Sequence, residues 1–124
     1  MTEPGDADKL SSEVRFFETA AELHRWFEAH HETAAELWIG LYKIGSGRAS
    51  VRWPDVVDEA LCFGWIDGIR RRIDDVSYKN RITPRRKGSN WSAINIARVA
   101  ALEASGRMQP AGRRAFERRD LKDS

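Results

Sequence analysis

The chain has 124 residues, of which 41% are hydrophobic and 32% charged, and its formal net charge is +2. This length favours one domain, and the apolar fraction is too high for an intrinsically disordered chain. One cysteine excludes an intrachain disulfide, and no stretch reaches the roughly 20 apolar residues that cross a bilayer. Residues 1–12 are polar and acidic, unlike a secretory signal, so we expect a disordered leader on a cytoplasmic protein.

The first half of the chain predicts a strand, a helix and a second strand. Residues 14–17 have the short apolar pattern of a strand. Thr19 and Glu22 fit a capping box, in which a hydroxyl and a carboxylate accept the free amides of a first helical turn. Apolar residues at a spacing of three to four then continue this helix over 19–31. Residues 36–44 alternate between two apolar faces, which predicts a central strand covered on both sides.

A helix and a hairpin are expected next. Pro54 suits a first helical position and Gly64 suits a left-handed helix end, so a helix should run between them. Residues 65–73 and 76–83 have the composition of two strands, and two aspartates can form the turn between them. Pro84 should end the second strand, because proline lacks the amide that continues a ladder.

Two short helices should complete the domain. Ser89 or Ser92 can cap the first of them, and Gly106 can end it. The second is expected over 110–119, with a proline at its first position. The order βαβαββαα, without an internal repeat, predicts a single α+β domain over 13–120 with a small, mainly antiparallel sheet, followed by a short tail.

Charge is divided unevenly along the chain. Residues 1–67 hold 6 Lys/Arg and 13 Asp/Glu, whereas residues 68–124 hold 15 Lys/Arg and 6 Asp/Glu. Eight cations gather between positions 70 and 87, namely Arg70, Arg71, Arg72, Lys79, Arg81, Arg85, Arg86 and Lys87. Arginine suits planar, bidentate recognition of carboxylate or phosphate, so this segment is a candidate basic face. A solvated surface of mixed charge is the simpler interpretation.

Strand alternation predicts which hairpin side chains share a face. On the first strand we expect Asp67 and Arg71 on one face and Arg70 on the other. On the second strand we expect Lys79 and Arg81 on the same face. A hairpin face of this kind can gather several guanidinium groups beside an aromatic ring and one carboxylate.

An anion cleft is the leading functional interpretation of these residues. Its candidates are polar or aromatic side chains on the hairpin and at the following helix start: Trp65, Asp67, Arg70, Arg81, Thr83, Arg85, Ser89, Trp91 and Asn95. Arginines would bind a carboxylate or phosphate, Asp67 would orient one of them, and the free amides of the helix start would add to the site. The alternative is structural, with Asp67 paired to Arg81 or Arg85 and a serine acting as an ordinary helix cap.

Three kinds of function stay open at this level. The first is a non-enzymatic binding module for a small anion or an acidic peptide group. The second is a nucleic-acid-binding domain that uses the basic hairpin and loop 70–87. The third is an enzyme with Asp67 as a base, which has little support because the sequence has no partner acid, P-loop or dinucleotide motif. We therefore expect a binding module, with no cofactor and no membrane insertion.

Two further residue types have weaker functional interpretations. Cys62 lies among apolar residues at a helix end, where a thiol is usually a small hydrophobe rather than a nucleophile. His24 and His31 could share a helix face with Glu28, but the tighter spacing of a metal-binding histidine pair is missing. Neither pattern predicts a catalytic or metal site.

Several separate motifs are similar to those of one known family. They are Leu37-Trp-Ile-Gly-Leu-Tyr-Lys43, Glu59-Ala-Leu-Cys-Phe-Gly-Trp-Ile-Asp-Gly68, Arg81-Ile-Thr-Pro-Arg85, Ser89-Asn-Trp-Ser-Ala-Ile-Asn95 and Gly106-Arg-Met-Gln-Pro-Ala-Gly112. In this order they resemble the YdeI/OmpD-associated family, small bacterial proteins also called bacteriocin-protection proteins. The resemblance implies a link to envelope stress or antimicrobial-peptide tolerance, and it assigns no catalytic residue. Gln109 departs from the family pattern, in which threonine is usual, and this change should affect a helix cap alone.

Overall fold

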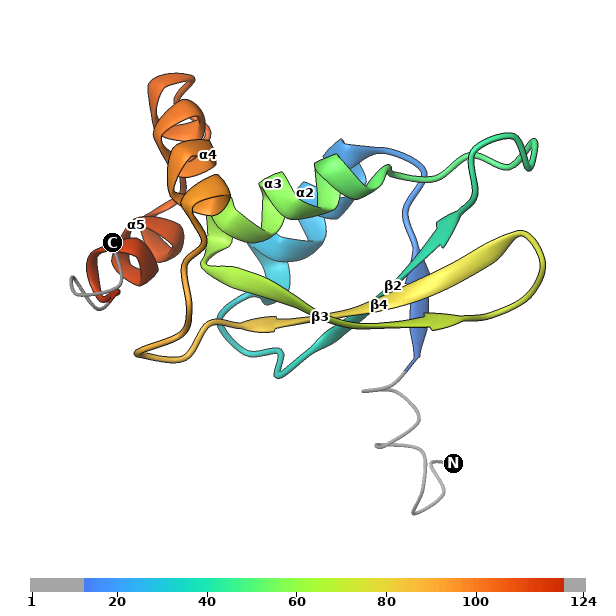
Figure 1. The fold of residues 1–124 in the computed structure, drawn as a ribbon, viewed down its shortest axis with the longest axis horizontal. Helices are drawn as coiled ribbons and strands as arrows, with labels where there is room; N and C mark the ends of the chain where they lie inside the picture. The colour runs from blue at the N-terminus through green and yellow to red at the C-terminus, as the bar shows by residue number, and fades with distance from the viewer. Residues whose placement is uncertain (1–12, 120–124) are drawn as a thin grey trace, which may run out of the picture.

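Strands and helices follow one another in the predicted order in residues 13–119, which the computed structural model describes (Figure 1). The strands are β1 (Val14–Phe16), β2 (Leu37–Tyr42), β3 (Trp65–Arg72) and β4 (Ser77–Pro84). The helices are α2 (Ala20–His30), α3 (Trp53–Phe63), α4 (Ala93–Ala104) and α5 (Pro110–Glu117). The α+β class and the order βαβαββαα are confirmed, while the predicted leader 1–12 and tail 121–124 lie outside the described residues.

The four strands form one mixed sheet in the order β1-β2-β4-β3. β1 runs parallel to β2, and α2 provides the crossover that a parallel pair needs. β2 pairs antiparallel with β4, and β4 pairs antiparallel with β3. β2 is therefore an internal strand, as predicted, and β1 and β3 form the two edges.

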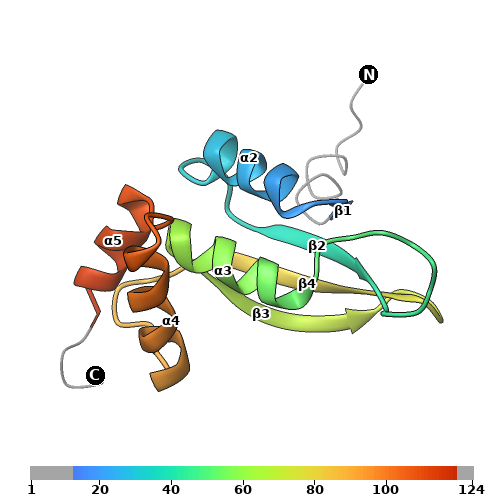
Figure 2. The same ribbon diagram turned by 90° about the horizontal axis from the view of Figure 1, so that it is seen from above.

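All helices of the described chain lie on one side of the sheet or at its end (Figure 2). α2 and α3 pack side by side on one face, and α4 and α5 pack against α3. The core between helices and sheet includes the fully buried side chains of Leu23, Phe27, Ile39, Leu61, Trp65 and Ile82. Within residues 13–119 no helix covers the opposite face, so the prediction that residues 36–44 are covered on both sides is wrong.

Local signals determine the helix ends. The Thr19 hydroxyl accepts the Glu22 amide at 3.2 Å, whereas the Glu22 carboxylate accepts the Glu18 amide at 3.1 Å, one residue before the predicted partner. Gly64 ends α3 with a φ of 78°, the left-handed conformation that favours glycine. Ser92, rather than Ser89, caps α4. No helix in this part of the chain has the length and apolar character to cross a membrane.

A β-bulge in β3 changes which side chains share a face. Two residues between Asp67 and Arg70 oppose a single residue of β4. Arg70 therefore lies on the helix-covered face together with Asp67, and Arg71 lies on the opposite face beside Lys79. The predicted distribution of these arginines is wrong for this reason, since an extra residue reverses the alternation that follows it. Gly68, inside the bulge, is the local sequence hint.

Candidate functional site

The residues predicted to line one anion cleft lie in three separate places. Arg81 and Thr83 lie on the helix-free face, where the Arg81 guanidinium pairs with the Glu36 carboxylate at 2.7 Å. Arg70 lies on the helix-covered face. The remaining candidates surround or adjoin Arg85: Trp65, Asp67, Ser89, Trp91 and Asn95. The set does not converge on one open cleft.

Arg85 is a buried cation with structural partners. The residue is 7% exposed, and its Nε donates to the Trp65 carbonyl at 3.3 Å. Its Nη1 donates to the Asn90 carbonyl at 2.9 Å and to the Ser89 hydroxyl at 3.4 Å. The guanidinium also lies 3.8 Å from the centre of the Trp91 ring. These contacts hold the loop between β4 and α4 against the start of β3.

The space beside Arg85 is too small for an anion. A hollow of about 10 Å³ is lined by Arg85, Asp67 and Asn95, and it has room for about one water molecule. Burial lowers the pKa of Arg85 to about 10, and the negative charge of Asp67 acts in the opposite direction. Within residues 13–119 Asp67 forms no ion pair, so its predicted pairing with Arg81 or Arg85 is absent. Trp65 also lines this space, but its side chain is buried in the core and offers no open wall to a ligand.

The helix-free side of the sheet carries a different group of aromatic and cationic side chains. We define the open face as Phe16, Trp38, Tyr42, Arg71, Lys79, Arg81 and Thr83, which strand pairing places on this side. In the described chain no strand residue of this face is acidic, and Glu36, just before β2, is the carboxylate that pairs with Arg81. Trp38 and Tyr42 were not predicted as site residues because β2 was expected to be covered on both sides, and Phe16 was predicted only as part of a short strand.

Phe16 and Tyr42 form a stacked pair on the open face. Their ring centres are 4.7 Å apart, and Phe16 is 41% exposed. The Phe16 ring lies across Gly40, where an added Cβ would come within 2.4 Å of the ring. Arg48 covers Tyr42 from the neighbouring loop, with its guanidinium 4.7 Å from the ring centre and a hydrogen bond of 3.1 Å to the hydroxyl. Glycine at position 40 is therefore what allows an aromatic ring to lie on the sheet.

Trp38 forms the second aromatic position of the open face. Its indole is half-buried, and the Lys79 ammonium lies 4.8 Å from the ring centre. Arg81 is the direct cross-strand neighbour of Trp38, and Arg71 is the cross-strand neighbour of Lys79. Each aromatic position of this face thus has at least one cation beside it.

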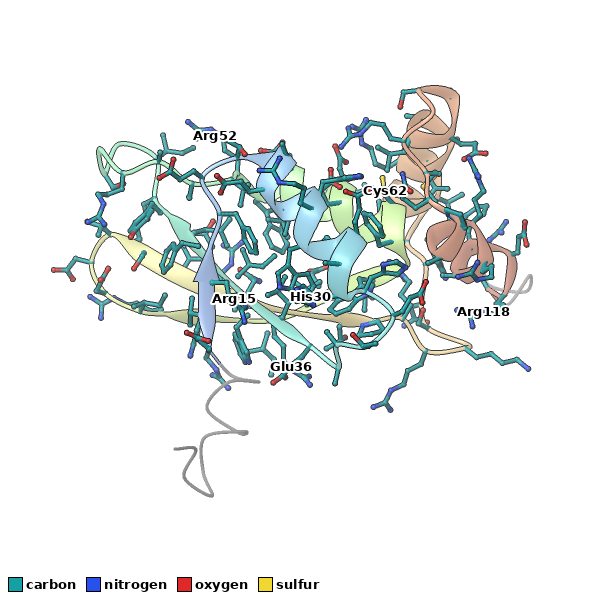
Figure 3. All side chains as sticks on the ribbon, turned by 180° about the vertical axis from the view of Figure 1, so that it is seen from behind. Arg15, His30, Glu36, Arg52, Cys62 and Arg118 are labelled. Carbon is teal, nitrogen blue, oxygen red and sulfur yellow. The ribbon has the colours of Figure 1, made fainter. Side chains whose placement is uncertain are left out.

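A second polar cluster, which the sequence did not predict, lies among the helices near Cys62 (Figure 3). Glu59 is 4% exposed, and its carboxylate lies 2.6 Å from His24 Nδ1 and accepts a hydrogen bond of 3.2 Å from Arg107. The neighbouring Asp58 accepts two hydrogen bonds of 2.7 Å from Arg98. These pairs join α2, α4 and the link to α5 with α3, so we interpret them as structural.

Cys62 is expected to be unreactive in the folded protein. Burial and, to a lesser degree, the charge of Glu59 raise the pKa of the Cys62 thiol from 9.0 to about 12. Because the thiolate is the reactive form, alkylation by iodoacetamide near pH 8 should be about 1,000-fold slower in the folded than in the urea-unfolded chain. Mass spectrometry measures both rates, and equal rates would contradict the burial of the thiol.

The same thiol should affect stability at high pH. Between pH 9.0 and about 12 the unfolded chain loses the Cys62 proton while the folded chain keeps it. The stabilisation from this group is therefore complete below pH 9.0 and decreases as the pH rises toward 12. The unfolding free energy of a Cys62→Ala variant, measured with urea, should lack the decrease that this thiol causes between pH 9.0 and about 12.

Comparison with known proteins assigns the chain to a family without naming an activity. A family model described as "Domain of unknown function (DUF8412)" matches residues 15–115, from β1 into α5. A search of curated proteins found no match, and a search of solved structures also found none. The resemblance to the YdeI/OmpD-associated family stays a prediction. The matched region, residues 15–115, is well over half of the 124-residue chain. The chain therefore belongs to the DUF8412 family of domains of unknown function.

Proposed function

We propose that this protein is a non-enzymatic binding module that takes single-stranded nucleic acid on its open face. The observation that carries this proposal is the uncovered sheet face itself, where aromatic rings on β1 and β2 lie beside cations on β4 and β3 and no strand residue is acidic. Nucleic acid was one of the alternatives left open by the sequence. The sequence-based version of this alternative used the basic hairpin and loop 70–87, whereas the present proposal uses the open face of the sheet.

The chemistry of the open face matches the two parts of a nucleotide. Bases of any sequence stack on aromatic side chains, and each such contact contributes about 1–3 kcal/mol. Phosphates attract lysine and arginine. When these cations neutralise phosphates, counterions leave the nucleic acid, so the affinity depends on the salt concentration. Trp38 with Lys79 and Phe16 with the cation-covered Tyr42 each provide a ring beside a positive charge. A strand with unpaired bases can use both features, whereas a duplex keeps its base faces covered.

Other ligands fit these features less well. A small anion or an acidic peptide group would use the cations and leave the aromatic rings without a role. The hollow at Arg85, with about 10 Å³, accommodates neither. Binding to nucleic acid also agrees with the cytoplasmic location that the sequence predicts. The implied link to envelope stress stays a prediction, and nothing in the open face depends on it.

A titration with labelled oligonucleotides tests the proposal. Oligo(dT) and oligo(rU) of about 12 nucleotides should bind, and the affinity should fall steeply as salt rises from about 50 to 200 mM. Trp38→Ala should weaken binding about tenfold by removing a stacking platform. Lys79→Ala should weaken it too and should reduce the salt slope by about one. Fluorescence anisotropy measures all of these quantities.

The control is Arg114→Ala, which removes an exposed cation from α5, away from the sheet. It should leave oligonucleotide affinity unchanged while altering net charge as Lys79→Ala does. Three results would each overturn the proposal: no binding at low salt, equal affinity for duplex and single strand, or an unchanged affinity in Trp38→Ala. Far-UV circular dichroism of each variant confirms that the comparison is made between folded proteins.

A further inference from the structure

We infer that Arg70, on the helix-covered side of β3, forms a second binding site for a small anion with a flat apolar body. Arg70 and Asn80 pair on the side of the sheet that carries α3, opposite to the open face, and Tyr42 adjoins both regions. The ligand class is an aryl phosphate or aryl carboxylate.

The Arg70 guanidinium is held in one orientation. Its Nε donates to the Asn80 side-chain oxygen at 3.2 Å, and Asn80 is 2% exposed. Its Cζ atom lies 4.5 Å from the centre of the Tyr78 ring and 5.3 Å from the centre of the Trp53 ring. A side chain fixed at Nε and supported by two rings keeps little freedom, so binding a ligand would cost little additional ordering.

The two terminal nitrogens of Arg70 have no hydrogen-bond partner in residues 13–119. Most arginines with ordered contacts in the described chain differ in this respect. Arg98 makes two bonds to Asp58, and Arg72, two residues from Arg70 on the same face, pairs with Asp75. Arg70 thus presents a preorganised fork, which is the geometry that binds the oxygens of a carboxylate or phosphate in a bidentate manner.

An apolar hollow lies beside the two rings that support Arg70, although Arg70 is not itself one of its lining residues. Both rings that support Arg70 also line a hollow of about 390 Å³, within the size range of small-molecule sites. The remaining lining is apolar or cationic, with no carboxylate: Leu41, Tyr42, Lys43, Ile44, Val51, Arg52 and Pro54. A flat apolar body in the hollow and an anionic group at Arg70 would use both parts together. This combination specifies an aromatic anion rather than inorganic phosphate.

Phenyl phosphate is the probe that tests this site. In ¹H–¹⁵N NMR titrations it should shift the Trp53 indole N–H signal and bind at least about tenfold more tightly than inorganic phosphate, because the ring adds apolar burial. Benzyl alcohol, which has the ring without the charge, should bind weakly. Arg70→Lys keeps the positive charge but loses the fork and should lose about tenfold in affinity. Arg72→Lys, the matched change on the same strand face, should leave the affinity unaltered.

Each alternative outcome overturns the inference. Equal affinity for phenyl phosphate and inorganic phosphate would remove the role of the hollow. An unchanged affinity in Arg70→Lys would remove the role of the fork. Shifts confined to Trp38 and Lys79 would place the probe on the open face instead. Oligonucleotide affinity should stay the same in Arg70→Lys, so failure of this site and failure of the proposed function give different results.

Discussion

Gly112→Ala is expected to destabilise the protein by about 3 kcal/mol or more, although alanine is the better helix former by about 1 kcal/mol. Gly112 lies in α5 where this helix crosses the end of α3. An added Cβ would come within 2.1 Å of the Cys62 carbonyl oxygen and 2.7 Å of the Leu61 carbonyl oxygen. Both oxygens belong to backbone and cannot rotate away. The whole of α5 would have to move outward, which separates apolar surfaces that pack well in the native protein.

Urea unfolding followed by tryptophan fluorescence measures this effect. Arg114→Ala in the same helix is the control, and it should change the unfolding free energy by less than about 0.5 kcal/mol, as exposed substitutions usually do. Displacing α5 should also weaken the packing of Trp91, because the centres of the Trp91 and Phe116 rings are 5.3 Å apart. An unfolding free energy of Gly112→Ala equal to or above that of the parent protein would contradict the close approach of the two helices.

The order of elements could be predicted because short-range signals determine it. Thr19 and Ser92 accept first-turn amides, and Gly64 takes a left-handed conformation at a helix end. These interactions involve residues within four positions of one another, so the sequence contains them completely. The α+β class followed from the same signals.

The faces of the hairpin could not be predicted in the same way. The two strands were located to within one residue at each end, but the bulge between Asp67 and Arg70 reversed the side chains that follow it. Regular alternation assumes that each residue of β3 lies opposite one residue of β4. Gly68 alone does not predict that two residues of β3 lie opposite one residue of β4 at this point. The functional consequence is large, because the bulge assigns Arg70 and Arg71 to opposite faces of the sheet.

The open face was missed for a different reason. Alternation of Leu, Ile and Leu with Trp, Gly and Tyr in β2 is equally expected for a strand between two apolar layers and for one with an exposed aromatic face. Lys79 and Arg81 were correctly assigned to one face of β4, and their pairing with β2 places them beside Trp38. Two cations on that face argue against a second apolar layer, but this inference required the strand order.

The partners of the arginines also depend on tertiary structure. Arg81 bonds to Glu36, 45 residues away, and Arg107 bonds to Glu59, 48 residues away. Arginines and carboxylates are numerous in this chain, so composition alone allows many pairings. The predicted cleft assumed that hairpin arginines were free, whereas Arg81 is paired and Arg85 is buried.

Glu59→Gln is expected to lower the unfolding free energy by about 2–3 kcal/mol. Both carboxylate oxygens of Glu59 are in use, one facing His24 and the other accepting from Arg107. A carboxamide has one acceptor oxygen and no charge. If that oxygen stays with Arg107, the NH₂ group faces His24 Nδ1, which accepts only when it carries no proton; if the oxygen turns to His24, the NH₂ group faces a guanidinium that cannot accept. In both arrangements Arg107 loses its buried negative partner. The position is 4% exposed, and water cannot replace the lost contact. The shape of the side chain is kept, so the loss measures the charge and the acceptor rather than a cavity.

Glu103→Gln is the matched comparison, since Glu103 also pairs with an arginine, Arg113, but both side chains are about half exposed. Exposed pairs contribute little, and this change should cost less than about 0.5 kcal/mol and become negligible at high salt. The Glu59 effect should persist at high salt because buried pairs are poorly screened. Similar small losses in both variants would show that the cluster on α3 is solvated. Because α4 and α5 are joined to α3 through this cluster, the Glu59→Gln protein should also show faster amide exchange in those helices than in the sheet.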